Sequence, residues 1–214
     1  MSKHVFLVAK LSAIVAGLTA LMLICVCVSL SFWVRLQAEE CLHALQQIKV
    51  GESKEADVRK ILEPFAKYER EGTASILGKD YPLRAYWIEN KGPHLIGVFS
   101  PARFGAGVIF RDGVVVDKGA GFTQHDRLSR VDYFVHTRES VPGFMHKESL
   151  DESPTGVAID KWEPPLQLGV FIDTRASRNA NEAAFDFDLR CFTTFLGCRN
   201  LHEILPRMNE QMVK

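Results

Sequence analysis

The sequence has no excess of charge of either sign. Its 26 Lys and Arg residues balance its 26 Asp and Glu residues, so the formal net charge at pH 7 is zero. Nucleic-acid-binding proteins usually carry a basic excess, and the balance argues against that class of partner. Internal repeats and low-complexity stretches are absent too, and 47% of the residues are hydrophobic, which argues against a wholly disordered or repeat-built chain.

The sequence signatures of common catalytic and metal sites are also missing. The chain contains no Gly-x-Ser-x-Gly or Ser-x-x-Lys motif for a serine nucleophile and no Cys-x-x-Cys pair for zinc. His125 directly precedes Asp126, and His136 precedes Glu139 by three residues. Two such ligands fall short of the three protein ligands that a catalytic zinc site needs. We therefore predict no catalytic residues, no metal and no cofactor.

Glycine is concentrated in two Gly-Ala-Gly triplets, at residues 105–107 and 119–121. A phosphate-binding loop would require a strand before the glycines and a helix after them, and neither triplet has that pattern around it. We expect turns or bends of a sheet at both places.

A long hydrophobic run is present near the N-terminus. Residues 11–34 contain no charged side chain, and as a helix they would extend over ~36 Å, enough to cross the ~30 Å hydrocarbon core of a bilayer. Lys3 and Lys10 precede the run, which favours a cytoplasmic N-terminus. The sequence thus predicts a single-pass protein of the cell membrane, with residues 1–10 cytoplasmic, residues 11–34 anchored in the lipid bilayer and residues 35–214 forming an exported periplasmic or extracellular domain.

A cleaved signal peptide is the alternative interpretation of this run. The apolar part of a signal peptide spans about 7–15 residues and ends at a small-x-small cleavage site. Here the run is longer, and the best candidate site, Leu36-Gln37-Ala38, has leucine where a small residue is required. We therefore expect the segment to remain as an anchor.

Five cysteines are divided between the two parts of the chain. Cys25 and Cys27 lie in the anchor, and three others lie in the exported part, where an oxidising compartment allows disulfides to persist. Cys191 and Cys198 enclose six residues, and closing so short a loop stabilises the fold by roughly 2.5 kcal/mol. We predict this disulfide, and a bond from Cys41 to one of the two is the alternative.

Residues 39–65 have the pattern of two short helices. Leu42 and Leu45 share one side of the first, which continues out of the anchor and ends at Gly51. Ser53 suits the N-cap of the second helix. Four apolar residues follow at helical spacing, and we predict that they cover a sheet and offer a candidate interaction face: Val58, Ile61, Leu62 and Phe65.

Residues 72–190 have the alternation and the turn signals of a sheet-rich region. The expected strands are 83–89, 95–100, a hairpin at 108–116 with Asp112-Gly113 in its turn, 130–136, 168–173 and 185–189. A long loop is expected at 148–165, an exposed turn at 174–183, and a short helix in the tail 191–214. The predicted fold class is α+β, with a transmembrane helix followed by two short helices packed on an antiparallel sheet.

One segment combines these signals in the order Leu45-x-x-Ile48-x-Val50-Gly51-x-Ser53-x-x-x-Asp57-Val58-x-x-Ile61-Leu62-x-Pro64. This order resembles the helix–Gly–helix opening of the small outer-membrane-assembly lipoproteins, the SmpA/OmlA or BamE-like family. The resemblance covers residues 45–64 and extends to about residue 118 when the hairpin is included. It implies two helices packed on a three-stranded antiparallel sheet and partners in envelope assembly.

Two classes of function follow from these observations. The first is a protein-binding or assembly module with other membrane or envelope proteins as partners, which would show an exposed apolar patch of several hundred Å². The second is an exported small-ligand sensor or enzyme that uses His125, His136 or a reduced cysteine in a cleft of the sheet, with polar groups converging in one pocket. A domain that only spaces a larger complex is the third interpretation.

Overall fold

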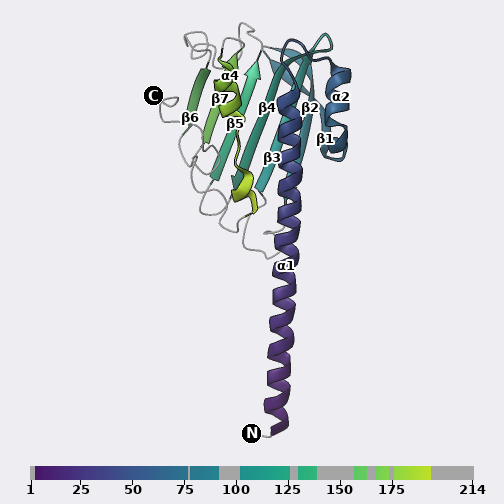
Figure 1. The fold of residues 1–214 in the computed structure, drawn as a ribbon, viewed down its shortest axis with the longest axis vertical. Coiled ribbons are helices and arrows are strands. Elements are labelled where there is room, and N and C mark those ends of the chain that lie inside the picture. The colour runs from purple at the N-terminus through teal and green to yellow at the C-terminus, as the bar shows by residue number, and fades with distance from the viewer. Residues whose placement is uncertain are drawn as a thin grey trace.

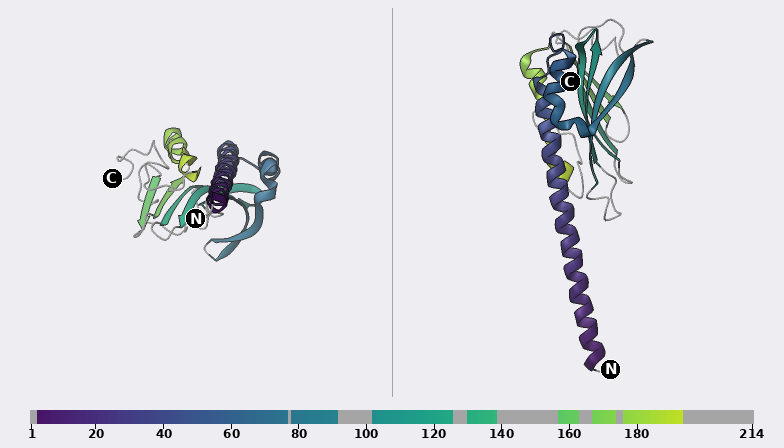
Figure 2. Two further views of the ribbon diagram at one scale, coloured as in Figure 1. Left: turned by 90° about the horizontal axis from the view of Figure 1, so that it is seen from below. Right: turned by 90° about the vertical axis from the view of Figure 1, so that its right-hand side faces the viewer.

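The computed structural model describes residues 3–76, 78–91, 102–125, 130–138, 157–162, 167–173 and 176–193. Its centre is a seven-stranded sheet with the strand order β1-β2-β3-β4-β5-β7-β6. The helices gather on one face of this sheet (Figure 2). The architecture confirms the predicted α+β class, and every strand pair is antiparallel except β5 with β7, which is parallel.

The elements follow one another in a simple order along the chain. The strands are β1 (Glu69–Ile76), β2 (Lys79–Asn90), β3 (Ala102–Arg111), β4 (Val114–His125), β5 (Arg130–Arg138), β6 (Val157–Trp162) and β7 (Gln167–Asp173). The α-helices are α1 (Lys3–Gln47), α2 (Glu55–Leu62) and α4 (Arg178–Ala184), and the 3-10 helices are η1 (Glu63–Tyr68) and η3 (Leu189–Thr193). The longest helix therefore precedes the whole sheet.

Helix α1 joins the apolar N-terminal run to the domain without a break. Its first part projects beyond the sheet and its last part lies along the strands (Figure 1), and it is long and apolar enough to cross a membrane. Every residue from Leu11 to Val26 is exposed, whereas Cys27 and Ser31 are 3% exposed. Ser31 Oγ donates a hydrogen bond to Asn90 Oδ1 over 3.1 Å. The domain thus already covers one side of the helix within the predicted anchor.

The hydrophobic core lies between α1 and the side of the sheet that faces it. Leu45 and Ile48 at the end of α1 are fully buried. Alternate residues of the central strands meet them, because successive side chains of a strand point to opposite faces: Tyr86, Ile88, Phe104, Phe122, Tyr133 and Val135. This division leaves the other face of the central strands outside the core.

The expected strand at 185–189 is not formed. Phe185, Phe187 and Leu189 are buried, as their alternation suggested, but Phe185 and Phe187 lie between α4 and η3 without strand pairing, and Leu189 is the first residue of η3. Phe187 packs edge to face against Tyr133 with ring centroids 4.9 Å apart. A segment that crosses the core buries alternate residues just as a strand does, so the pattern alone could not separate the two.

The predicted hairpin and the turn after α1 are confirmed, with one correction. Asp112 and Gly113 have φ angles of 52° and 76°, which fits the two-residue turn that Asp-Gly favours. Gly51 has a φ of 80°, and its backbone N–H donates to the Val115 carbonyl oxygen over 2.8 Å. Ser53, however, is not the N-cap of α2: its Oγ accepts from the Lys49 backbone N–H instead, over 2.9 Å.

Two expectations for the C-terminal half were wrong. Strand β6 occupies part of the expected loop 148–165, and α4 occupies most of the expected turn 174–183. Ser177 starts α4 by accepting a hydrogen bond from the Ala180 backbone N–H over 3.2 Å, a local capping signal that the polar composition concealed. The expected strand 95–100 and the expected C-terminal helix lie outside the described residues.

The candidate interaction face on α2 is part of the chain's own core. Val58, Leu62 and Phe65 are 0%, 1% and 4% exposed, and Ile61 is half-buried against the same cluster. This face is covered because α2 packs against α1 while η1 packs against β2. These side chains are therefore not presented to a partner.

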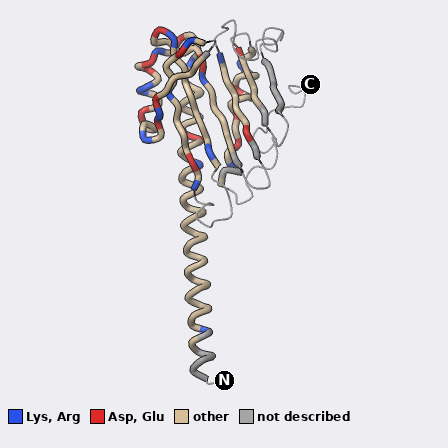
Figure 3. The backbone as a smooth tube through the Cα atoms, turned by 180° about the vertical axis from the view of Figure 1, so that it is seen from behind, with Lys and Arg blue, Asp and Glu red and all other residues tan. Residues whose placement is uncertain are grey.

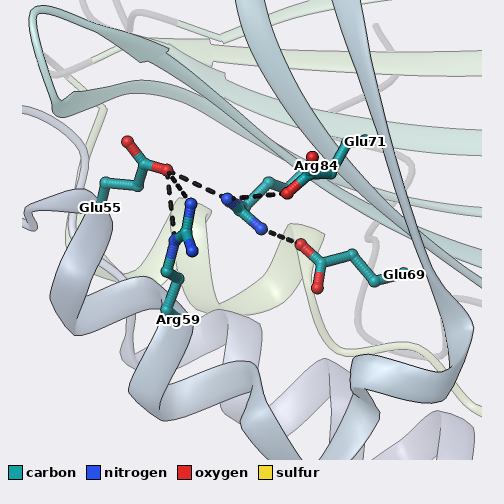
Figure 4. A network of polar contacts seen from close by, with 5 residues as sticks. All are labelled: Glu55, Arg59, Glu69, Glu71 and Arg84. Atoms are coloured by element: carbon teal, nitrogen blue, oxygen red, sulfur yellow. Dashed lines mark hydrogen bonds and ion pairs between the residues drawn. The ribbon is translucent and has the colours of Figure 1, made fainter.

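An ion cluster ties α2 to the first two strands (Figure 4). Arg84 on β2 is 9% exposed, and its Nη2 lies 3.1 Å from Oε1 of both Glu55 and Glu71. Its Nη1 donates to Glu69. Arg59 and Arg84 both donate to the Glu55 carboxylate and hold its pKa below the usual value. The cluster fixes α2 beside the sheet and serves a structural purpose.

The cysteines differ from the prediction in one respect. Cys41 is a free thiol, fully buried where α1 packs on the core, so the alternative disulfide through Cys41 is wrong. Cys41 lies on the side of α1 that faces the sheet, so its thiol is surrounded by apolar side chains. The side chain of Cys191 and all of Cys198 lie outside the described part of the chain, where the predicted disulfide would be.

The buried thiol predicts a loss of stability in alkali. Burial raises the pKa of Cys41 from 9.0 to about 12. Between these two values the unfolded chain loses the thiol proton and the folded chain keeps it, so the free energy of unfolding falls as the pH rises, by up to ~1.4 kcal/mol per pH unit. Denaturant unfolding of the full-length protein should show this slope, and Cys41→Ala should lack that component. Equal slopes would contradict the described burial of Cys41.

Candidate functional site

The two Gly-Ala-Gly triplets lie side by side in the middle of the sheet, not in turns as expected. Gly105 on β3 pairs with Gly121 on β4, and Gly107 pairs with Gly119. The alanine of each triplet faces the core and is nearly fully buried. The four glycines consequently share the opposite face and leave it without side chains over two neighbouring strands.

A groove of about 260 Å³ lies over these glycines on the open face. Its walls are mainly apolar and include Leu83, Ala85, Trp87, Ile109 and Phe134, with Thr123 among the few polar residues. Trp87 is 42% exposed, and beyond α1 it is the large apolar side chain that the described domain exposes most. The sheet therefore carries a concave apolar surface on the side away from α1.

Close packing requires glycine at two corners of the groove. A Cβ atom on Gly105 would lie 2.8 Å from Cζ3 of Trp87, and one on Gly119 would lie 2.6 Å from Nδ1 of His136. The indole and the imidazole thus lie directly over the glycine backbone. Gly107 differs, because a Cβ there would lie 3.6 Å from Cδ1 of Leu83, which is ordinary contact. A side chain at position 107 can therefore fill the groove without displacing its walls.

A buried polar cluster closes one end of the groove. The Asp117 carboxylate is 1% exposed, and its Oδ2 accepts from Nε of Arg138 over 2.6 Å. Its Oδ1 lies 3.1 Å from Nδ1 of His136. His136 stacks on Phe171, and the Arg138 guanidinium lies 5.2 Å from the centre of that ring. Burial lowers the pKa of Arg138, an effect that the adjacent carboxylate opposes.

The cluster favours hydrogen bonding to a ligand over nucleophilic catalysis. An Asp carboxylate accepts from the Nδ1–H of His136, which leaves Nε2 of the neutral ring as an acceptor. Such a pair resembles the base of a hydrolase, but no serine, cysteine or lysine lines the described groove. Among the described residues, no group of three or more His, Cys, Asp or Glu side chains is placed to hold a metal ion.

A second cavity, of about 390 Å³, lies beside the end of α1. Lys118 reaches into it, and burial lowers the pKa of this lysine to about 8. Its Nζ donates to the carbonyl oxygens of Leu45, Gln46 and Ile48 over 3.2, 3.3 and 2.6 Å. The Leu45 carbonyl also accepts from the Ile48 backbone N–H over 3.1 Å. Carbonyls at a helix C-terminus need donors from outside the helix, so Lys118 caps α1, and its ammonium group is already used by the fold.

Of the two histidines singled out in the sequence, His136 enters the groove. Its carboxylate partner is Asp117 on the neighbouring strand, and Glu139 lies outside the described residues. His125 is the last residue of β4, and its side chain is not among those described. The sequence contained part of a signal for the groove, because one glycine triplet ends five residues before Asp112 and the other begins six residues after Gly113. The register shift between Ile109 and Phe110 supplies the extra residue that brings the triplets opposite one another.

The chain was also compared with known proteins. No protein-family model, no curated protein and no solved structure matches it. The groove and its polar end are therefore the features on which a function can be proposed.

Proposed function

We propose that this protein is a single-pass membrane-anchored binding protein whose exported domain holds an elongated apolar ligand in the groove. The observation that supports this function is the apolar groove of about 260 Å³ over four paired glycines. Small-ligand sites are concave and mostly apolar, with a few polar groups that fix orientation. The groove has this composition, with the Asp117 cluster at one end.

The projecting part of α1 supports the anchor. It carries no charged side chain between Lys10 and Arg35 (Figure 3), and its exposed apolar surface would be unfavourable in water. The lysines that precede it favour a cytoplasmic N-terminus and an exported domain. The cell membrane is accordingly the proposed location.

A protein-binding or assembly module is supported less well. Such a module should expose a broad apolar patch, and the apolar stripe on α2 is buried in the core. Beyond α1 and the groove, the described domain offers no comparable surface. The resemblance of residues 45–64 to the BamE-like family, with its implied partners in envelope assembly, stays a prediction.

Filling the groove should weaken binding strongly. In Gly107→Val the side chain takes the place of two or three methylene groups of a ligand, at ~0.8 kcal/mol each, so affinity should fall roughly tenfold or more. The full-length protein, placed in nanodiscs with Trp33→Phe and Trp162→Phe, reports binding through quenching of Trp87 by 1-bromododecane. Quenching should saturate in the parent protein and stay linear and weak in Gly107→Val.

The matched control is Gly72→Val, which adds the same side chain to a strand glycine outside the groove with no atom within 4 Å of its Cβ. This control should bind as the parent does. Linear quenching in the parent protein, as from probe dissolved in the bilayer, would overturn the proposed function.

A further inference from the structure

We infer that the groove takes a single-chain lipid with an uncharged, hydroxyl-bearing head, such as a monoacylglycerol, drawn from the bilayer. The inference rests on the proposed function and names the ligand of the same groove. The acyl chain lies over the glycines, and the head lies against His136. Three observations support this assignment: the length of the groove, its direction relative to the anchor, and the charge of its polar end.

The groove is long enough to hold one extended chain. It runs along β4 from Thr123 to Asp117, which are six residues apart, or about 20 Å at ~3.3 Å per residue. Its volume of about 260 Å³ is just below the usual ~300–1,000 Å³ of small-ligand sites. Its lining is mainly apolar and extends from Leu83 on β2 to His136 on β5, so the groove admits an acyl chain laid along the strands.

The Thr123 end of the groove lies on the side of the sheet nearer the anchor. Ser31 of α1 contacts Asn90, which pairs with Ala102, and Ala102 pairs with Gln124 beside Thr123. The polar end lies at the other extreme, because Lys118, next to Asp117, caps the C-terminus of α1.

The bilayer reaches the same edge of the sheet. The exposed stretch of α1 from Lys10 to Val26 is ~25 Å long as a helix, close to the ~30 Å of a bilayer core. The remaining thickness brings the membrane surface to about the level of Ser31, one turn after Cys27, the first of the described helix residues to be buried. The Thr123 end of the groove is therefore the end nearer the bilayer, from which we propose that the chain enters.

The polar end suits a hydroxyl group better than a charged head. The Asp117 charge is paired with Arg138 at 2.6 Å, so this part of the cluster is neutral. A carboxylate or phosphate would add a negative charge beside a buried carboxylate, which is unfavourable in a poorly solvated site. With Nδ1 of His136 engaged by Asp117, Nε2 is the ring nitrogen left for a ligand, and it can accept a hydrogen bond that a hydroxyl group donates.

Photo-crosslinking of the full-length protein in phosphatidylcholine vesicles tests the assignment. Three probes share one diazirine-bearing chain and differ in the head: a monoacylglycerol, a fatty acid and a lysophosphatidylcholine. Labelling of the anchor measures the local concentration of each probe. The quantity compared between probes is the ratio of labelling of the peptides that contain Trp87 or Phe134 to labelling of the anchor. The monoacylglycerol should give a ratio roughly tenfold above the other two, because its head places no negative charge beside the buried Asp117 carboxylate.

Variants separate the head from the chain. His136→Phe keeps a ring over Gly119 and should reduce the monoacylglycerol ratio to that of the other probes, whereas His136→Gln retains an acceptor and should restore the preference. Equal ratios in the wild type, or preference for the fatty acid, would overturn the assigned head and leave the proposed function standing. Anchor labelling without groove labelling by any probe would overturn both.

Discussion

Asp117→Ala is expected to lower the free energy of unfolding by about 3–5 kcal/mol, the cost of removing one partner from a buried ion pair. The carboxylate is 1% exposed and is bonded to both Arg138 and His136. Its removal deprives the Arg138 guanidinium, whose side chain is 12% exposed, of this buried carboxylate. The loss should appear in denaturant unfolding of the full-length protein followed by circular dichroism.

Two further variants make this prediction specific. Asp80→Ala removes an exposed carboxylate from β2 and should change stability by less than about 0.5 kcal/mol. Adding Arg138→Met to Asp117→Ala should recover part of the lost stability, because the double variant no longer buries a guanidinium beside the position from which the carboxylate was removed. A double variant less stable than Asp117→Ala would show that Arg138 does not depend on this carboxylate.

Lys118→Met is expected to cost about 2–4 kcal/mol, because it leaves three helix-terminal carbonyl groups without their charged donor. Methionine keeps much of the apolar stem but cannot donate to Leu45, Gln46 and Ile48. The favourable interaction of the ammonium group with the C-terminal end of the helix dipole is also lost. The free energy of unfolding of the full-length protein measures this effect.

Lys49→Met is the matched control, since it removes an exposed ammonium group close to the same helix end. Lys49 pairs only at the surface with Glu52, and both side chains are 70% exposed, so the expected change is below about 1 kcal/mol. Similar losses in the two variants would contradict the capping role of Lys118.

Asp117 and Lys118 show what local sequence could and could not reveal. Both lie in a stretch expected to belong to the sheet, and both would ordinarily be assigned to a solvated surface. Because neighbouring strand residues point to opposite faces, Asp117 reaches the groove and Lys118 reaches the end of α1. Their partners, Arg138 and Leu45, are far away in the chain, and no spacing rule connects them.

The sequence by itself determined the elements whose signals are local. The long uncharged run predicted the projecting helix, the Asp-Gly pair predicted the β3–β4 hairpin, and alternation predicted strands at 83–89 and 130–136. Each of these signals depends on residues within a few positions of one another, where helix period, strand period and turn preference act directly.

Only the tertiary structure decided which surfaces remain free. Packing buried the stripe on α2, left Cys41 as a lone thiol in the core, and placed the parallel strand β7 beside β5. Strand register set glycine opposite glycine and brought His136 to Asp117. These outcomes depend on contacts between distant segments, which are stabilised by burial and by strand pairing. No short stretch of sequence indicates which distant segments will meet.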